Sequence, residues 1–311
     1  RIRRTGHDGY VLGYIYDRQG RLDQMTNAAG MSIVDYDYDA GGRLIRKTLG
    51  SGVFTTYKHN AAGQIVCLVN CRPDKSVLSC YQYAYDSEGH TVNVHAQRGY
   101  DGLPVDEVLS VAYDPLGQLV CVQYSNGRVV SYEYDAVGNR TVVRDKSVSE
   151  IYTANALNQY VSVGDTQFLH DADGNITNES RNGTNRILAY DPQNRLTRVI
   201  DGTSSVTFTY DAFGNRASIE NGNGTSKRYI TDPFNMGNIV AEYNGGDNLE
   251  ARYDYGVGLV RMVDGLGASA DYTFTPIGST SEVVNNGAVV NAYGYDAWGV
   301  LSGRVESVPN P

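Results

Sequence analysis

The stretch Tyr210-Asp211-Ala212-Phe213-Gly214-Asn215-Arg216 decides the fold, because the same frame recurs along the whole chain. In each copy an aromatic residue precedes an aspartate, and a glycine follows three positions after that aspartate. The complete frames are Tyr16-Asp17 with Gly20, Tyr38-Asp39 with Gly42, Tyr85-Asp86 with Gly89, Tyr113-Asp114 with Gly117, Tyr134-Asp135 with Gly138, Tyr210-Asp211 with Gly214, and Tyr295-Asp296 with Gly299. Most copies lie roughly 20–22 residues apart, a period that is typical of repeat architectures.

Incomplete copies keep the same phase. Asparagine replaces the glycine at Asn194, after Tyr190-Asp191, and at Asn158, after Asn155. The other incomplete copies are His59-Asn60 with Gly63, His170-Asp171 with Gly174, Thr231-Asp232 with Asn235, and Phe274-Thr275 with Gly278. Together the copies predict about fourteen hairpin repeats.

The chemistry of the frame is that of a hairpin turn. An aspartate at the first position accepts hydrogen bonds from backbone N–H groups that follow it, and glycine supplies the left-handed conformation of a type I turn with a G1 bulge. Asparagine also adopts that conformation, which explains Asn158 and Asn194. The frame residues are therefore predicted to be structural, with no catalytic role.

Alternating segments separate the frames. In Val206–Tyr210, valine, phenylalanine and tyrosine alternate with threonine, which is typical of a strand with one buried face. Midway between frames lie short signals of two-residue hairpins, which are Asn126-Gly127, Asn182-Gly183, Asp201-Gly202, Asn221-Gly222, Gly245-Gly246 and Asn286-Gly287. The two turn classes should therefore lie on opposite edges of an antiparallel sheet.

The fold class predicted from this pattern is all-β, with tandem antiparallel hairpins. About fourteen hairpins give more strands than an open twisted sheet usually holds, and exposed edges promote aggregation. We therefore expect the sheet to curl into a wide barrel or a spiral, hollow β-shell. One repeat domain should span residues 1–311.

The composition of the chain disfavours some classes of function. The 311 residues carry a formal net charge of −9, which disfavours a surface that binds nucleic acid. Tyrosine is abundant, with 25 Tyr against 6 Phe and 1 Trp, and tyrosine suits packed layers that border a wet surface or cavity. No apolar run approaches the ~18 residues of a membrane span, and no signal peptide opens the chain. The repeat is already in phase near Tyr10, so we expect the chain to be a piece of a longer protein.

Four cysteines lie at Cys67, Cys71, Cys80 and Cys121. If Pro73-Asp74 is a hairpin tip, Cys67 pairs with Cys80 across two strands and Cys71 pairs with Ser76. Cross-strand cysteines can reach bridging range. Two interpretations stay open: a Cys67–Cys80 disulfide, or four small apolar strand residues.

The phased series resembles the YD repeat of the Rhs (rearrangement hot spot) family, which includes the C components of insecticidal toxin complexes, wall-associated bacterial toxins and the teneurins. Residues 232–311 resemble the segment that leads into the Rhs core, with Asp232–Val240, Pro276–Thr280 and Tyr295–Gly299 carrying the likeness. The resemblance implies a hollow β-shell around a toxin or another segment of the same polypeptide, in a secreted or cell-surface protein. Since no position matches the family's self-cleaving residues, we expect no enzyme activity here.

Other chemistry finds little support in the sequence. Asp171-Ala172-Asp173-Gly174-Asn175 resembles the opening of a calcium loop, but the downstream glutamate is missing and the stretch falls in the repeat phase. Gly265-Leu266-Gly267 fits a loose dinucleotide fingerprint without the helix that phosphate binding requires. We expect no metal and no cofactor. The alternative function is a cell-surface adhesion module that binds a glycan through an exposed aromatic groove.

Overall fold

The computed structural model describes residues 2–6, 8–99, 106–232, 234 and 237–308, and every regular element in them is a β-strand. The first group is β1 Arg3–Thr5, β2 Val11–Tyr16, β3 Leu22–Thr26, β4 Ser32–Tyr38, β5 Leu44–Leu49, β6 Phe54–His59, β7 Ile65–Cys71, β8 Val77–Tyr85, β9 Thr91–Arg98 and β10 Asp106–Tyr113. The second group is β11 Leu119–Tyr124, β12 Val129–Tyr134, β13 Arg140–Asp145, β14 Val148–Ala154, β15 Tyr160–Val163, β16 Thr166–His170, β17 Ile176–Arg181, β18 Thr184–Tyr190, β19 Leu196–Asp201 and β20 Ser204–Tyr210. The last group is β21 Arg216–Asn221, β22 Ser226–Thr231, β23 Ile239–Asn244, β24 Leu249–Gly256, β25 Gly258–Asp264, β26 Ser269–Phe274, β27 Thr280–Asn285, β28 Ala288–Tyr295 and β29 Leu301–Glu306.

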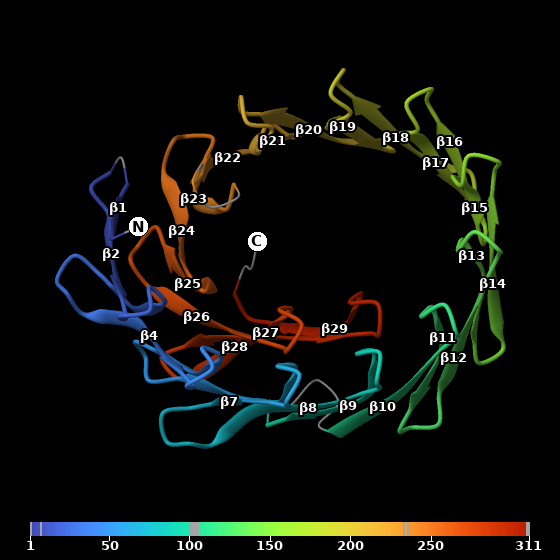
Figure 1. Cartoon of the computed structure of the whole chain (residues 1–311). Coiled ribbons are helices and arrows are strands. Elements are labelled where there is room, and N and C mark those ends of the chain that lie inside the picture. The colour runs from blue at the N-terminus through green and yellow to red at the C-terminus, as the bar shows by residue number, and fades with distance from the viewer. Residues whose placement is uncertain (1, 7, 100–105, 233, 235–236, 309–311) are drawn as a thin grey trace.

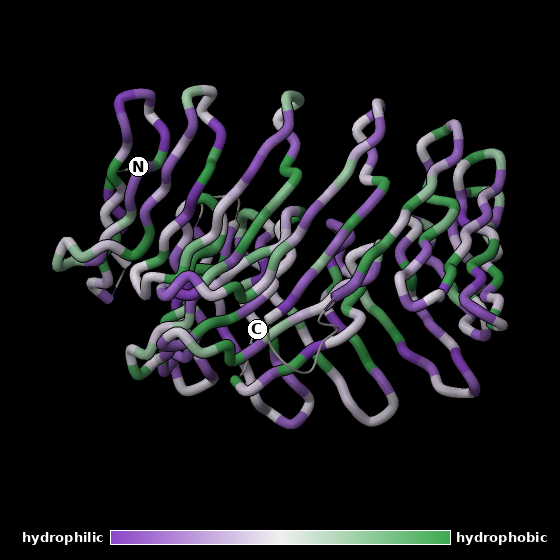
Figure 2. The backbone as a smooth tube through the Cα atoms, turned by 90° about the horizontal axis from the view of Figure 1, so that it is seen from below, coloured by the Kyte–Doolittle hydropathy of each residue, from purple (hydrophilic) through white to green (hydrophobic). Residues whose placement is uncertain are grey.

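These strands form one continuous antiparallel ribbon. Each strand pairs with its neighbours in sequence, from β1 with β2 to β28 with β29, in a single 29-stranded sheet. Hairpin tips project from both edges of the ribbon (Figure 2). The prediction of an all-β fold built from tandem antiparallel hairpins is confirmed.

The ribbon curls around an open lumen, and its last strands then run along the inner side of its first strands (Figure 1). β1 and β29 do not pair, so the sheet stays open rather than closing into a barrel. Instead β24–β29, called the inner layer below, pack face to face on β1–β12, called the outer layer (Figure 1). Of the two expected shapes, the spiral is the one that forms.

The hydrophobic core lies where the two layers overlap. Its largest cluster joins fully buried side chains of the outer layer, such as Leu12 and Ile33, to Val260 and Val284 of the inner layer. No described residue from 133 to 231 is buried. We call residues 133–231 the single-layer wall, because only backbone pairing and partly exposed side chains hold it together.

The frames form the predicted turns. In the copy at Asp211, its N–H donates to the carbonyl of Asn215 (2.9 Å), and the Gly214 N–H donates to the Asp211 carbonyl (3.1 Å). Asp211 Oδ1 also accepts from the N–H groups of Phe213 (2.9 Å) and Asn215 (2.8 Å). Gly214 has a φ of 85°, and Asn158 and Asn194 have values of 60° and 58° at the same slot. In the copy at Asp232 the turn is longer, because Gly237 donates to the Asp232 carbonyl; Asn235 lies outside the described residues.

The other edge differs from expectation. Asn182-Gly183 and Asn286-Gly287 are two-residue loops, as predicted. The loop predicted at Asp201-Gly202 is Gly202-Thr203, because Asp201 pairs with Ser204. The two-residue loops predicted at Asn126-Gly127, Asn221-Gly222 and Gly245-Gly246 are wrong. These turns repeat the frame geometry, because the N–H groups of Tyr124, Asn221 and Asn244 donate to the carbonyls of Arg128, Thr225 and Asn248. The Tyr-Asp frames share one edge, but the turn geometry itself occurs on both.

The cysteine register also needs correction. Cys67 lies opposite Gln82 and Cys80 lies opposite Val69, so the predicted direct pairing is wrong by two residues. The turn between Arg72 and Ser76 has three central residues instead of the predicted two, which pairs Cys71 with Val77 rather than with Ser76. A bulge between Asn70 and Cys71 adds one further residue to the shift. All four cysteines are free thiols. Burial, and then the neighbouring Cys67 thiol, raise the pKa of Cys80. The Cys67–Cys80 disulfide stays a prediction.

Replacing Gly214 tests the frame turn. No heavy atom lies within 4 Å of the position that a Cβ would take, so only backbone strain opposes a side chain there. We expect Gly214→Val to lower the free energy of unfolding by more than ~1 kcal/mol, since β-branched residues rarely adopt positive φ. Gly214→Asn should cost less, because asparagine already fills this slot twice. Thermal melts compare the two variants, and equal melting temperatures would contradict the assignment.

Candidate functional site

The frame tyrosines point toward the lumen and join one repeat to the next. In six of the seven complete frames the tyrosine hydroxyl donates to a backbone carbonyl just after the preceding frame. The bonds run from Tyr38 to Leu22 (2.8 Å), Tyr85 to Ile65 (2.8 Å), Tyr113 to Thr91 (3.0 Å), Tyr134 to Leu119 (2.7 Å), Tyr210 to Leu196 (2.7 Å) and Tyr295 to Thr280 (3.0 Å). The many tyrosines in the sequence indicate that their hydroxyl groups need hydrogen-bond partners, but the sequence does not show which carbonyls accept these bonds. This ladder explains why tyrosine, rather than phenylalanine, occupies the frame.

In several frames the residue after the glycine links neighbouring turns along the edge. Arg43 Nε donates to Asp39 Oδ2 (2.7 Å), and Arg43 Nη1 reaches the carbonyl of Asn60 in the next turn (3.1 Å). Asn139 bonds to Asn158 in the same way (3.1 Å). Backbone and side-chain hydrogen bonds from Arg43 hold the pKa of Asp39 below its ordinary value. The frame carboxylates therefore accept hydrogen bonds within their own turns. That the frame residues have a structural role stays a prediction.

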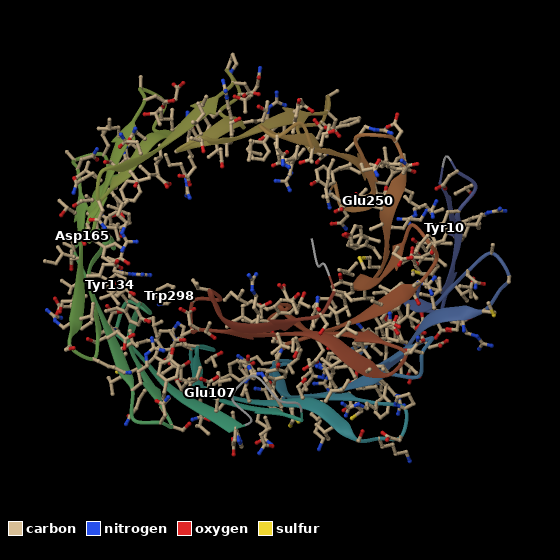
Figure 3. All side chains as sticks on the ribbon, turned by 180° about the vertical axis from the view of Figure 1, so that it is seen from behind. Tyr10, Glu107, Tyr134, Asp165, Glu250 and Trp298 are labelled. Carbon is tan, nitrogen blue, oxygen red and sulfur yellow. The ribbon has the colours of Figure 1, made fainter. Side chains whose placement is uncertain are left out.

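An arginine clasp joins the end of the inner layer to the wall. The Arg140 guanidinium lies 4.2 Å from the ring centroid of Trp298 and 5.4 Å from those of Tyr132 and Tyr152. Trp298 also packs edge-to-face on Tyr132, with centroids 5.3 Å apart. Trp298 lies at the tip of the inner layer, near the wall segment that carries Tyr134 (Figure 3). Such contacts combine burial with cation–π attraction, so the last frame is anchored to the wall.

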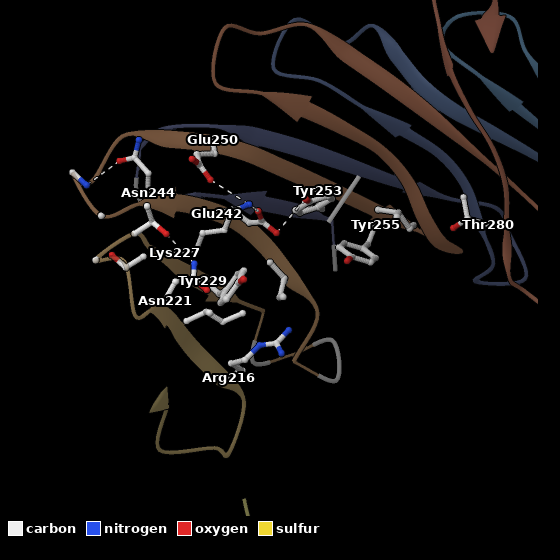
Figure 4. Close-up of a pocket in the computed structure, with 18 of the residues that line it drawn as sticks. Arg216, Asn221, Lys227, Tyr229, Glu242, Asn244, Glu250, Tyr253, Tyr255 and Thr280 are labelled. Atoms are coloured by element: carbon white, nitrogen blue, oxygen red, sulfur yellow. Dashed lines mark hydrogen bonds and ion pairs between the residues drawn. The ribbon is translucent and has the colours of Figure 1, made fainter. Parts of the chain in front are cut away.

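A hollow of about 1020 Å³ opens on the inner face of β21–β27. Asp254 and Arg252 of β24 contact Tyr10 and Asp8 of the outer layer, so they point away from the lumen. Because side chains alternate along a strand, Tyr253 and Tyr255 of the hollow point to the inner face. Figure 4 shows the side chains that line the hollow, which include Arg216, Tyr229, Glu242, Tyr253, Tyr255 and Tyr272. The site is aromatic with a few polar groups, a composition that suits ligand recognition.

Lys227 is paired with both glutamates of this hollow. Lys227 Nζ lies 3.1 Å from Glu242 Oε2 and 3.3 Å from Glu250 Oε2. The Tyr253 hydroxyl donates to the buried Glu242 carboxylate (3.2 Å). Partial burial pulls the pKa of Lys227 down, but the bonds to Glu242 and Glu250 outweigh it, and the pKa rises. Both carboxylates are thus engaged by the ammonium, which favours binding through stacking and hydrogen bonds over proton transfer. No sequence motif signals this site, because its residues come from separate repeats.

Polar side chains also cross the seam between the layers. Lys47 Nζ donates to the carbonyl of Tyr272 (3.2 Å), and the Ser51 hydroxyl bonds to Asp271. Burial lowers the pKa of Lys47 to about 8, while the charge of Asp271 opposes that shift. Burial likewise raises the pKa of Asp271. A buried charge is costly unless it is paired, so these groups favour one register of the two layers.

A second polar cluster lies deeper in the seam. Ser79 Oγ lies 3.4 Å from Ser281 Oγ, and the Tyr81 hydroxyl lies 2.5 Å from the same Ser281 oxygen. The fully buried Glu282 accepts from Ser281 (2.7 Å) and from Thr273. Residues about two hundred positions apart in sequence therefore meet through hydrogen bonds between side chains.

The structure places the two rejected motifs in turns. Asp171 Oδ1 accepts the N–H groups of Asp173 (3.0 Å) and Asn175 (2.9 Å), as in the other frames. Gly265-Leu266-Gly267 forms the turn between β25 and β26. Within the described part of the chain, no group of three or more His, Cys, Asp or Glu side chains could hold a metal ion. None of the described elements is a helix long and apolar enough to cross a membrane.

Comparison with known families matches the teneurin YD-shell model to residues 106–307 and the RHS repeat model to residues 38–66. The tRNA nuclease WapA of Bacillus subtilis strain 168 is 26% identical over 290 residues, which are 90% of this chain and 12% of WapA. Teneurin-3 of Mus musculus is 24% identical over 333 residues, which cover 96% of this chain and 12% of teneurin-3. The chain thus spans only 12% of the length of these curated relatives.

Solved structures share the fold. The crystal structure of TcdB2-TccC3 superposes with a TM-score of 0.80 at 17% identity, covering 99% of this chain and 18% of that chain. The Photorhabdus luminescens Tc holotoxin pore gives a TM-score of 0.76 at 17% identity, covering 99% of this chain and 17% of that chain. At this identity the likeness concerns architecture alone.

Proposed function

The chain belongs to the teneurin YD-shell family, and from that membership we propose that it is a wall segment of a hollow shell that encloses another part of its own polypeptide. In this proposal residues 1–311 act as one structural unit of a longer shell, in a secreted or cell-surface protein of the polymorphic-toxin type. The unit catalyses no reaction. WapA is a tRNA nuclease, and we assign to the matched 12% of its length the enclosing role rather than the nuclease activity.

The observation that carries the proposal is the aromatic inner face of the ribbon. Phe208 pairs with Ile219, which pairs with Lys227 of the hollow, so Phe208 shares the luminal face. Successive cross-strand pairs connect Leu169 and Ile187 to Ser205. Ser205 and Phe208 lie on opposite faces of β20, because side chains alternate along a strand. Leu169 and Ile187 therefore lie on the outer face, opposite Phe208. A luminal wall of partly exposed aromatic rings tolerates both water and an unfolded guest.

The path of the chain supports the same role. Asn291 on β28 donates to the carbonyl of Val308 (2.9 Å), which holds the last described residue beside the inner layer. β29, the last strand, lies on the inner side of the ring (Figure 1). The alternative of an adhesion module that binds a glycan requires an aromatic groove on the outer surface. The luminal position of the frame tyrosines favours enclosure instead.

Binding of an unfolded polypeptide tests the proposal. The probe is fluorescently labelled, reduced and carboxymethylated lactalbumin, which stays unfolded, and its anisotropy is titrated with the purified chain. We expect binding that weakens at least about fivefold when Phe208→Ser and Tyr229→Ser remove two luminal rings, because each loses contact area with the guest.

The matched control carries Leu169→Ser and Ile187→Ser, which remove two apolar side chains from the outer face of the same wall. This pair should leave the titration unchanged. Far-UV circular dichroism checks that both variants fold. No binding at all, or equal weakening by the luminal and the outer pair, would refute enclosure through the inner face.

A further inference from the structure

The arginine that anchors Trp298 has an equivalent farther along the single-layer wall. Arg140 and Arg216 each occupy the second position after a frame glycine, which is Gly138 in one copy and Gly214 in the other. In the other frames this position holds an uncharged residue, most often leucine or isoleucine. An arginine at this point of the repeat therefore distinguishes two places in the chain.

Both arginines lie between two aromatic rings in the same register. The Arg216 guanidinium lies 5.9 Å from the ring centroid of Phe208 and 5.5 Å from that of Tyr229. Arg140 lies 5.4 Å from each of its two rings, Tyr132 and Tyr152. In both copies one ring stands three residues before the aspartate of the same frame, and the other stands three residues before the aspartate or asparagine of the next frame. Each arginine with its two rings is called a clasp below.

The two clasps differ in what covers them. Trp298 of the inner layer lies over the Arg140 clasp, with its ring centroid 4.2 Å from the guanidinium and its edge against Tyr132. Arg140 is half-buried there, whereas Arg216 is exposed. Among the described residues Arg216 makes no ion pair, and its ring contacts are those with its two flanking rings. The Arg216 clasp therefore presents to the lumen the kind of surface that the Arg140 clasp covers with an indole.

The surroundings of the Arg216 clasp favour a ring over an acidic group. Arg216 and Tyr229 line the hollow on the inner face (Figure 4). The charged side chains that line it, among the described residues, are Arg216, Lys227, Glu242 and Glu250, so the hollow has no excess of positive charge. A ring that stacks on the guanidinium needs no such excess, because it gains cation–π attraction and buries apolar area against the flanking rings.

We propose that the Arg216 clasp binds an aromatic side chain, above all tryptophan, of a polypeptide segment inside the lumen. Trp298 supplies the precedent within this chain, since a segment that runs along the inner side of the ribbon offers its indole to the equivalent clasp. Tryptophan is also the strongest cation–π partner among the side chains. The proposal rests on the enclosing role proposed above and names one residue type by which the wall holds its guest.

Fluorine NMR tests this site, with the purified chain and a short glycine-serine peptide that carries one fluorotryptophan. We expect the fluorine resonance to broaden as protein is added. Arg216→Gln should weaken this binding at least about fivefold, because both flanking rings stay while the cation is lost. Unlabelled peptides that carry tryptophan, leucine or glutamate at the same position then compete with the probe, and the tryptophan peptide should displace it best.

Arg198→Gln is the matched control. It removes an exposed arginine from the outer face, because Arg198 pairs with Thr207, the neighbour of luminal Phe208. This variant should bind the probe like the wild type, and circular dichroism checks that both variants fold. A resonance that does not broaden, equal weakening by the two variants, or displacement by the leucine or glutamate peptide as strong as by the tryptophan peptide would overturn the proposal.

The outcome can be separated from that of the enclosure experiment. Unfolded lactalbumin that binds while the tryptophan peptide does not would refute this clasp and leave enclosure intact. A tryptophan peptide that binds through Arg216 while lactalbumin does not would refute enclosure and leave the clasp as a site for aromatic side chains.

Discussion

Leu68→Ala is expected to lower the free energy of unfolding by about 2–5 kcal/mol, whereas Leu169→Ala should cost less than about 1 kcal/mol. The two substitutions remove the same atoms. Leu68 is 1% exposed beneath the inner layer, where its loss leaves a cavity between two packed sheets. Leu169 is 64% exposed on the outer face of the single-layer wall, where water replaces the lost side chain.

Chemical denaturation of the two variants measures this difference. It also tests where stability resides, because the wall buries no described side chain between residues 133 and 231. Similar losses in both variants would show that the wall is as tightly packed as the overlap. That outcome would contradict the division of the ring into a two-layer seam and a thin wall.

Local features of this fold could be predicted from the sequence because they depend on short segments. The Tyr-Asp frame determines where strands end, and glycine or asparagine at the third position after aspartate marks the left-handed residue, as at Gly214 and Asn194. Alternation in segments such as Val206–Tyr210 indicates the strands between the turns. Turn length was predicted less well. Asn221-Gly222 carries a two-residue signal, yet Gly224 takes the positive φ and the loop is longer.

The overlap of the layers could not be predicted. It depends on the accumulated curvature of the ribbon, which brings Lys47 to Tyr272 and Ser79 to Ser281. No local pattern signals such contacts, and the polar residues involved resemble solvent-facing strand positions. The cysteine register was missed for a related reason. A turn that is one residue longer than predicted and a bulge after Asn70 together move Cys80 from Cys67 to Val69, and a bulge of this kind depends on the twist of the neighbouring strands.

A disulfide across the seam is expected to stabilise the protein strongly. Ser79 and Ser281 have their hydroxyl oxygens 3.4 Å apart and lie 202 positions apart in sequence. Both serines are fully buried between the layers. Replacing both with cysteine and oxidising the folded protein should close a very long loop of the unfolded chain. Chain-entropy reasoning then predicts a gain of about 4–5 kcal/mol over the reduced double variant.

The last strands of the ribbon lie on its first strands, and the same variant tests this overlap. The measurement is mass spectrometry of peptides from the Ser79→Cys, Ser281→Cys protein, oxidised either folded or in denaturant. Each single variant, oxidised in parallel, controls for exchange with the native cysteines, Cys80 in particular. We expect a linked peptide that joins positions 79 and 281 in the folded sample and its near absence in the denatured one. A folded sample that yields no 79–281 link, while its circular dichroism matches that of the wild type, would contradict the overlap of the two layers.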